Sequence, residues 1–198
     1  LENWAQANAK LNKLQEKFDD NGISDPAKLS GEIQRFTKDH YVVVEHVMRQ
    51  LFVDEVSFKG GDDHTTCNLG KWMPKFETTN KLLLDKLEAI KAPHKRFHEA
   101  VGKIKQMCQQ KRCAEGQVFY QEQMIPAMEE VFAGFAEIQS IADESYQLQT
   151  DIKDLMLGEV RETKATAMTL LDKIVQINRD ESARVAKAAQ NDASFMQM

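Results

Sequence analysis

The sequence has few residues that break helices and no long apolar run. Proline and glycine number 4 and 9 among 198 residues, which favours helix over strand and loop. No stretch approaches the roughly 18 apolar residues that a membrane span needs, and no signal peptide is recognisable. The chain starts at Leu1 and ends in Ala-rich sequence, so we expect it to be a segment of a longer protein.

Basic residues are also too few for a nucleic-acid surface. The formal net charge is −5, and no cluster of Lys and Arg interrupts the acidic balance, which argues against a nucleic-acid partner. Charged residues make up 29% and hydrophobic residues 42% of the chain, as in ordinary soluble domains. A chain of this length can bury one core, so we expect a single helical domain over residues 1–198.

The spacing of apolar residues predicts an all-α fold. Apolar side chains recur at helical intervals, and turn or capping residues such as Asn21-Gly22 separate the runs. The expected helices cover residues 1–20, 26–56, 70–76, 81–109 and 117–190. We therefore predict an antiparallel four-helix-type bundle with a long C-terminal stalk helix.

The predicted stalk carries an apolar repeat close to heptad spacing. Its members are Leu157, Val160, Ala167, Leu171 and Ile174. Such a repeat is typical of helices that pair with other helices, so the stalk predicts a homodimer.

The candidate metal-binding side chains lie mainly in two short stretches, Cys67-Asn68-Leu69-Gly70-Lys71-Trp72 and His94 to His98. His94 and His98 lie one helical turn apart, so both rings can face one ion. Thiolate and imidazole are the ligands that zinc prefers, four at a time and tetrahedrally placed. Cys67 can supply the thiolate, and the site then needs one more ligand.

Three other histidines are candidates for that ligand. His40 lies on the predicted core stripe with Val43 and Val47, whereas His46 lies off it. His64, three residues before Cys67, is a loop alternative. We predict His40, Cys67, His94 and His98 as the ligands of a Zn²⁺ site.

These residues resemble the chemoreceptor zinc-binding domain. The family pattern is an upstream His, then Cys-x-aliphatic-Gly-x-aromatic, then His-x-x-x-His. Cys67 to Trp72 and His94 to His98 match it fully, over about residues 36–105. The upstream element is looser, because His40 is followed by Val43 where the family usually has an aromatic residue or Leu. The interval to Cys67 also favours His40 over His46.

A second resemblance covers Ala114-Glu115-Gly116 through Met124-Ile125-Pro126-Ala127-Met128-Glu129. It is similar to bacterial methyl-accepting chemotaxis-type receptors that carry the zinc unit inside an extracytoplasmic helical sensor. The resemblance implies an inner-membrane receptor with this segment in the periplasm. Cys108 and Cys113 are either a disulfide that staples a loop or spare thiols, and the disulfide would agree with an extracytoplasmic location.

A zinc ion with four protein ligands has no open position for catalysis, and no nucleophile elbow, phosphate loop or HExxH motif is present. We therefore expect no enzyme activity. The leading hypothesis is a sensory domain in chemotaxis, in which zinc occupancy, thiolate oxidation or a small-molecule signal shifts helices. The alternatives are a zinc-stabilised structural dimerisation module and a regulatory unit of a cyclase or kinase.

Overall fold

The computed structural model describes residues 2–53 and 56–195, and every regular element in that part of the chain is helical. This confirms the all-α fold class and the long C-terminal helix. The elements in chain order are α1 (Glu2–Asn21), α2 (Pro26–Phe52), α3 (Asn68–Trp72), η1 (Met73–Lys75), α4 (Lys81–Gln109), α5 (Cys113–Phe119), η2 (Tyr120–Met124), α6 (Ile125–Leu155), η3 (Met156–Val160) and α7 (Arg161–Phe195).

Several helix boundaries differ from those expected, and two of the differences are large enough to matter for the fold. The second helix ends at Phe52 and does not reach Val56, and residues 54–55 lie outside the described part of the chain. The helical stretch expected over 117–190 starts earlier, at Cys113, and two π-helical segments, η2 and η3, divide it. Pro126 is the second residue of α6, which begins directly after η2 ends at Met124. It has no N–H to donate, so the regular α-helical ladder cannot continue unchanged there.

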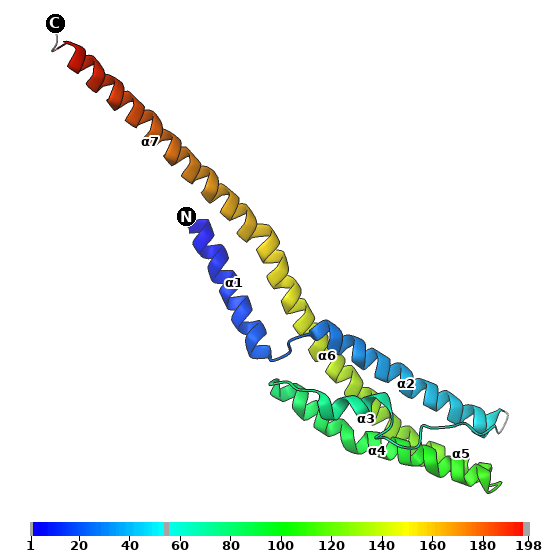
Figure 1. Cartoon of the computed structure of the whole chain (residues 1–198). Helices are drawn as coiled ribbons and strands as arrows, with labels where there is room; N and C mark the ends of the chain where they lie inside the picture. Colours follow the sequence, from blue (N-terminus) through cyan, green and yellow to red (C-terminus); the bar gives the residue numbers. More distant parts are fainter. Residues whose placement is uncertain (1, 54–55, 196–198) are drawn as a thin grey trace. The chain divides into compact units, whose positions relative to one another are not determined.

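The chain divides into two compact units, one of residues Lys17–Gln149 and one of residues up to Glu16 together with those from Thr150 onward. In the Lys17–Gln149 unit, α2 and α4 run in one direction and α6 returns in the other (Figure 1). Their apolar faces meet in one core. Its largest buried apolar side chains are Ile33, Phe36, Leu69, Leu83, Phe97, Ile104, Met124, Phe135 and Ile138.

Caps at the helix starts fix where α2 and α4 begin. Asp25 accepts a hydrogen bond from the Lys28 N–H at 2.9 Å, and Pro26 occupies the first turn of α2, where its missing N–H costs nothing. Asn80 caps α4 by accepting from the Leu83 N–H at 2.7 Å, and its amide donates to the Asn21 carbonyl at 2.7 Å. One side chain therefore starts α4 and ties it to the end of α1.

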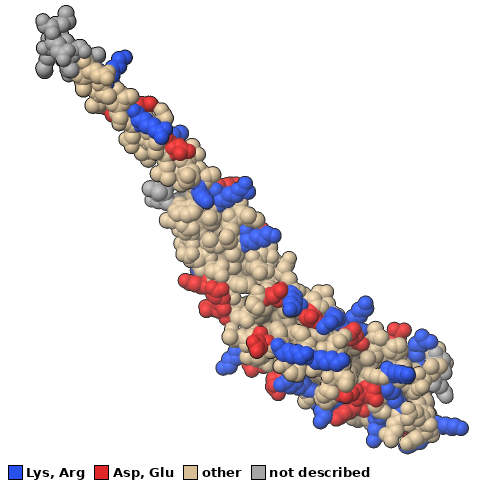
Figure 2. Space-filling model, in the orientation of Figure 1, with Lys and Arg blue, Asp and Glu red and all other residues tan. Residues whose placement is uncertain are grey.

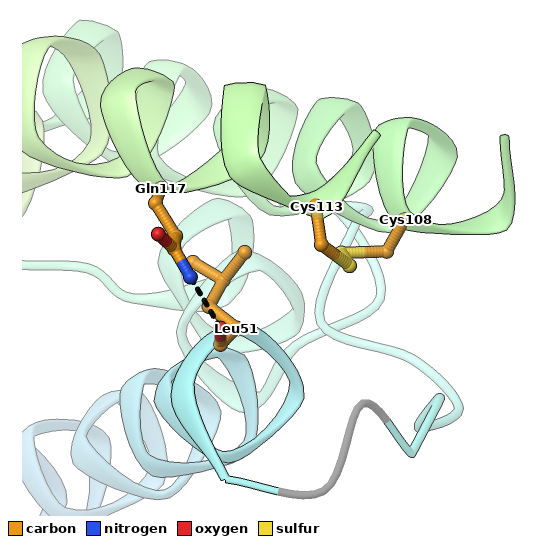
Figure 3. The surroundings of a disulfide bond; sticks show 4 residues. All are labelled: Leu51, Cys108, Cys113 and Gln117. Atoms are coloured by element: carbon orange, nitrogen blue, oxygen red, sulfur yellow. Dashed lines mark hydrogen bonds between the residues drawn. A yellow bond between two sulfur atoms is a disulfide. The ribbon is translucent and has the colours of Figure 1, made fainter. Parts of the chain in front are cut away.

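The end of α4 is held by covalent and polar contacts around the next turn (Figure 3). Cys108 and Cys113 form a disulfide that closes the turn between α4 and α5, which resolves the two readings of these cysteines. Gln117 donates to the Leu51 carbonyl at 2.7 Å, so α5 is fastened to the last turn of α2.

Lys and Arg side chains are interspersed with Asp and Glu over the Lys17–Gln149 unit on the face drawn in Figure 2. Several neighbours pair within or between helices, among them Lys86 with Glu137 at 2.8 Å and Arg96 with Glu130 at 2.7 Å. Exposed pairs of this kind contribute little each. The fold therefore depends on its core and caps.

The Asn80 cap generates a first prediction. Asn80→Ala removes the α4 cap and the bond to Asn21, and should lower the free energy of unfolding by about 1–2 kcal/mol. Asn80→Asp keeps the acceptor and should lose less, and Lys103→Ala on the exposed face of α4 should change little. Urea unfolding of the three variants measures this, and equal stability of Asn80→Ala and wild type would contradict it.

Candidate metal centre

The Cys67 segment (Cys67–Trp72) is a loop end that turns directly into the short helix α3. Cys67 is the N-cap of α3, and its sulfur accepts from the Gly70 N–H at 3.2 Å. Asn68 donates to Asp39 of α2 at 2.7 Å, and the Trp72 ring packs on Phe36 with centroids 5.3 Å apart. The segment is therefore fastened to α2 next to His40.

Gly70 is required by the close approach of the preceding loop. A Cβ atom at this position would lie 1.8 Å from the His64 carbonyl oxygen, far inside van der Waals contact. Any side chain would push the loop away and move the Cys67 sulfur with it. The glycine in the sequence pattern thus has a steric role in placing the thiol.

His94 and His98 lie on the inner face of α4, at relative exposures of 3% and 1%. Their Nε2 atoms are 3.0 Å apart, and the His94 Nε2 is 3.3 Å from the Cys67 sulfur. The helical spacing therefore brings both rings to the sulfur, as the sequence predicts.

His40 is the third buried histidine. It lies on α2 at 2% exposure, and its Nδ1–H donates to the Phe36 carbonyl at 2.7 Å. Its Nε2 atom is buried and has no hydrogen-bond partner. A buried acceptor without a partner is costly, and a metal ion at this place would satisfy it.

The other two histidines are placed differently. His46 is exposed and stacks on Phe58, with ring centroids 5.3 Å apart. His64 is half-buried, and its ring centroid is 6.1 Å from that of His94. Among the histidines, the structure thus brings His40, His94 and His98 together with the Cys67 sulfur.

The four ligand atoms of His40, Cys67, His94 and His98 lie within 4.8 Å of one another. Zinc bonds of about 2.0–2.3 Å in a tetrahedron separate neighbouring ligand atoms by about 3.3–3.7 Å. The observed contacts of 3.0 and 3.3 Å at His94 are close to that range. Three imidazoles and one thiolate also match the ligand preference of zinc, so the residues fit the ion.

Carbonyl groups outside the cluster orient two of the rings. His98 Nδ1–H donates to the Gly61 carbonyl at 2.7 Å, as His40 Nδ1–H does to Phe36. A carbonyl can only accept, so Nε2 of each ring carries the free lone pair, which is the arrangement common among metal-binding histidines. Lys105 holds the Gly61 loop in turn, with bonds of 3.0 Å to the Gly60 carbonyl and 3.1 Å to Asp62.

The sequence reasoning missed these carbonyl partners. Lys59-Gly60-Gly61 indicates a loop but not which carbonyl faces α4, because that depends on tertiary contacts. The bond to the Phe36 carbonyl could have been predicted from the sequence, because Phe36 lies four residues before His40 and a helical side chain can reach back that far.

Burial sets the protonation of the cluster. Desolvation, and after it the neighbouring histidines, lower the pKa of His94 to about 3 and that of His98 to about 4. Burial likewise lowers the pKa of His40 and raises the pKa of the Cys67 thiol. At neutral pH the three imidazoles are therefore ready to bind a cation, while the thiol still carries its proton.

Comparison with known families adds an independent observation. Residues 40–105 match the model of the chemoreceptor zinc-binding domain. This stretch begins at His40, contains the whole cluster and covers a third of the chain. The donor geometry and the match together support a zinc-binding signalling domain with Zn²⁺ as its cofactor. No curated protein and no solved structure matches the chain.

The localisation expected from the sequence, an inner-membrane receptor with this segment in the periplasm, is wrong. Over residues 2–53 and 56–195, no helix combines the length and apolar character needed to cross a membrane, and the family match is to a zinc-binding domain. The Cys108–Cys113 disulfide, which would agree with that location, is formed.

The protonation pattern generates a second prediction. At pH 7 zinc binding should release about one proton per ion, since only the Cys67 thiol must deprotonate. Calorimetry in buffers of different ionisation enthalpy measures this number, and Cys67→Ser should reduce it towards zero. Release of two or more protons would mean that a histidine is charged in the zinc-free protein, against the depressed pKa values.

Proposed function

We propose that this chain is a sensory signalling domain in which His40, Cys67, His94 and His98 hold one Zn²⁺. The observation that carries the proposal is the convergence of four ligand atoms from α2, α4 and the Cys67 segment within 4.8 Å. The match of residues 40–105 to the chemoreceptor zinc-binding domain supports it.

The ligand set favours sensing over catalysis. When bound, zinc would be held by four protein ligands, without the open position that a catalytic ion keeps. The surroundings are also apolar, since the His40 ring contacts Phe97 and Phe135 at centroid distances of 5.5 and 5.4 Å. We therefore propose that the domain has no enzyme activity.

Two inputs can act on this site. Loss of the ion would free the Cys67 sulfur from the three histidines, because the shared ligation ends, while Asn68 and Trp72 would still hold the segment on α2. Oxidation of the Cys67 thiolate would weaken its ligation in the same way. Either change alters how three elements are held, and helix shifts of about 1–2 Å are a recognised switching mode. We propose that such a shift is the signal, with a chemotaxis-type output.

The burial of the site favours a second candidate, a purely structural zinc. The three histidines are at most 3% exposed, as core groups are, so the ion could serve only to stabilise the bundle. The two candidates differ in what zinc removal does: a sensor stays folded and shifts its helices, and a scaffold unfolds.

The ligand assignment gives a third prediction. Wild type should bind about one zinc per chain, and His94→Ala or Cys67→Ala should weaken zinc affinity more than about 100-fold. His46→Ala is the matched control, because it removes a histidine of α2 outside the cluster. Competition with a chromophoric chelator measures the affinities.

Zinc retained at full affinity in His94→Ala would refute the ligand set. Circular dichroism of chelated wild type then separates the two candidates. Retained helix with altered near-ultraviolet signal supports sensing, and loss of helix supports the scaffold.

We further propose that the domain works as a homodimer through α7. One half of this helix carries large apolar side chains that are exposed within the described chain, while the opposite half is polar. The exposed apolar members are Met168, Leu170, Leu171, Ile174, Val175, Ile177 and Val185. A one-sided apolar stripe is typical of helices that pair, and a second copy supplies an identical stripe.

The dimer gives a fourth prediction. Glutamates at Leu171 and Ile174, which are 55% and 54% exposed, should raise the dimer dissociation constant more than about 100-fold, because each buries a charge. Glutamates at Thr169 and Gln176 on the polar half of α7 are the matched control. Sedimentation velocity measures the dissociation constants, and an equal effect of both pairs would rule out this interface.

A further inference from the structure

A cavity of about 590 Å³ lies beside the metal centre, between α4 and the segment from the Cys67 loop through η1. Its size is within the range of small-molecule sites, about 300–1,000 Å³. Gly70, Met73 and Phe76 line one side, and the other is formed by α4 residues including His94. His94 therefore belongs both to the cavity wall and to the cluster of metal ligands.

The α4 wall changes character along the helix. Leu84 and Leu87 line it near the start of α4, and Lys91 and Lys95 follow one and two turns later. Met73 and Phe76 add apolar surface from the opposite side. The cavity thus has an apolar part away from the metal centre and a basic part close to His94.

The charges that line the cavity favour an anion. Two cationic side chains, Lys91 and Lys95, line the cavity together with a single carboxylate, that of Glu88. Lys91 pairs with Glu88 at 2.5 Å, and Lys95 is 3.7 Å from Glu99 outside the cavity. Both pairs are exposed, so neither commits its lysine strongly. The Lys95 ammonium in particular can turn to a negatively charged ligand.

We propose that this cavity binds a small amphiphilic carboxylate. Its apolar body packs against Leu84, Leu87 and Phe76, and its carboxylate pairs with Lys95 and Lys91. An apolar chain with a single anionic end matches the order of residues along α4, whereas a cation would meet two lysines. Binding itself does not require zinc, and a signalling role for the ligand rests on the proposed function.

A ligand in this cavity would contact elements that carry two of the metal ligands. Its carboxylate end lies beside His94, and its body touches the segment that carries Cys67. A ligand that favours one position of this segment must change zinc affinity, and zinc must change ligand affinity by the same factor.

Octanoate is the probe, with octylammonium and octanol as controls that have the same chain and a different head group. Octanoate should bind with a dissociation constant below about 1 mM and shift the ¹³C-methyl resonance of Met73, and octylammonium should not.

Lys95→Glu should weaken octanoate binding at least about fivefold. Lys103→Glu makes the same charge change on the exposed face of α4 and should leave it unaltered. Leu84→Gln should weaken octanoate and octanol alike.

Equal binding of octanoate and octylammonium, or equal effects of Lys95→Glu and Lys103→Glu, would overturn the proposal, as would saturation only far above 1 mM. Zinc affinity is measured on the same samples. A protein that binds zinc but not octanoate refutes the cavity proposal and leaves the proposed function intact. A protein that binds octanoate but not zinc refutes the proposed function and leaves the cavity proposal intact.

Discussion

Exclusion of water from the three histidine ligands is the constraint on which the rest of the site depends. The same helices that bury Phe36, Phe97 and Phe135 also bury His40, His94 and His98. Burial keeps the imidazoles neutral and leaves the His40 Nε2 without a hydrogen-bond partner. A bound cation would therefore satisfy this nitrogen atom, which the core leaves without a partner. The free energy of metal binding then becomes part of the stability of the bundle.

The sequence predicts the elements and the inner ligands well because each rests on local physics. Helical periodicity and caps such as Asn80 define most helix limits, and the spacing of His94 and His98 is enough to place both on one face. His40 was distinguished from His46 by its apolar stripe, and burial separates the two in the same way. Local pattern was sufficient wherever the decisive neighbours lie within one helix.

Other features depend on contacts between distant parts of the chain, which local pattern does not carry. The Gly61 carbonyl reaches His98 across 37 residues, and the loop position that allows it comes from Lys105. The π-helical segments η2 and η3 interrupt a stretch whose apolar spacing is continuous. The periplasmic localisation came from a resemblance, with the Cys108–Cys113 pair as its one physical sign, and it is wrong.

The four ligands are not held equally firmly, because the Cys67 sulfur is placed by a loop that packs closely on Gly70. His40, His94 and His98 belong to two long helices, but Cys67 precedes a helix of five residues. The Cys67 thiol is thus the ligand anchored by the shortest helix. It is also the ligand that must lose a proton before it binds zinc. Metal and acid compete at this one sulfur atom, so the zinc concentration that fills the site rises as the surroundings become more acidic. The zinc occupancy of the site therefore depends on the free zinc concentration and on the local acidity together.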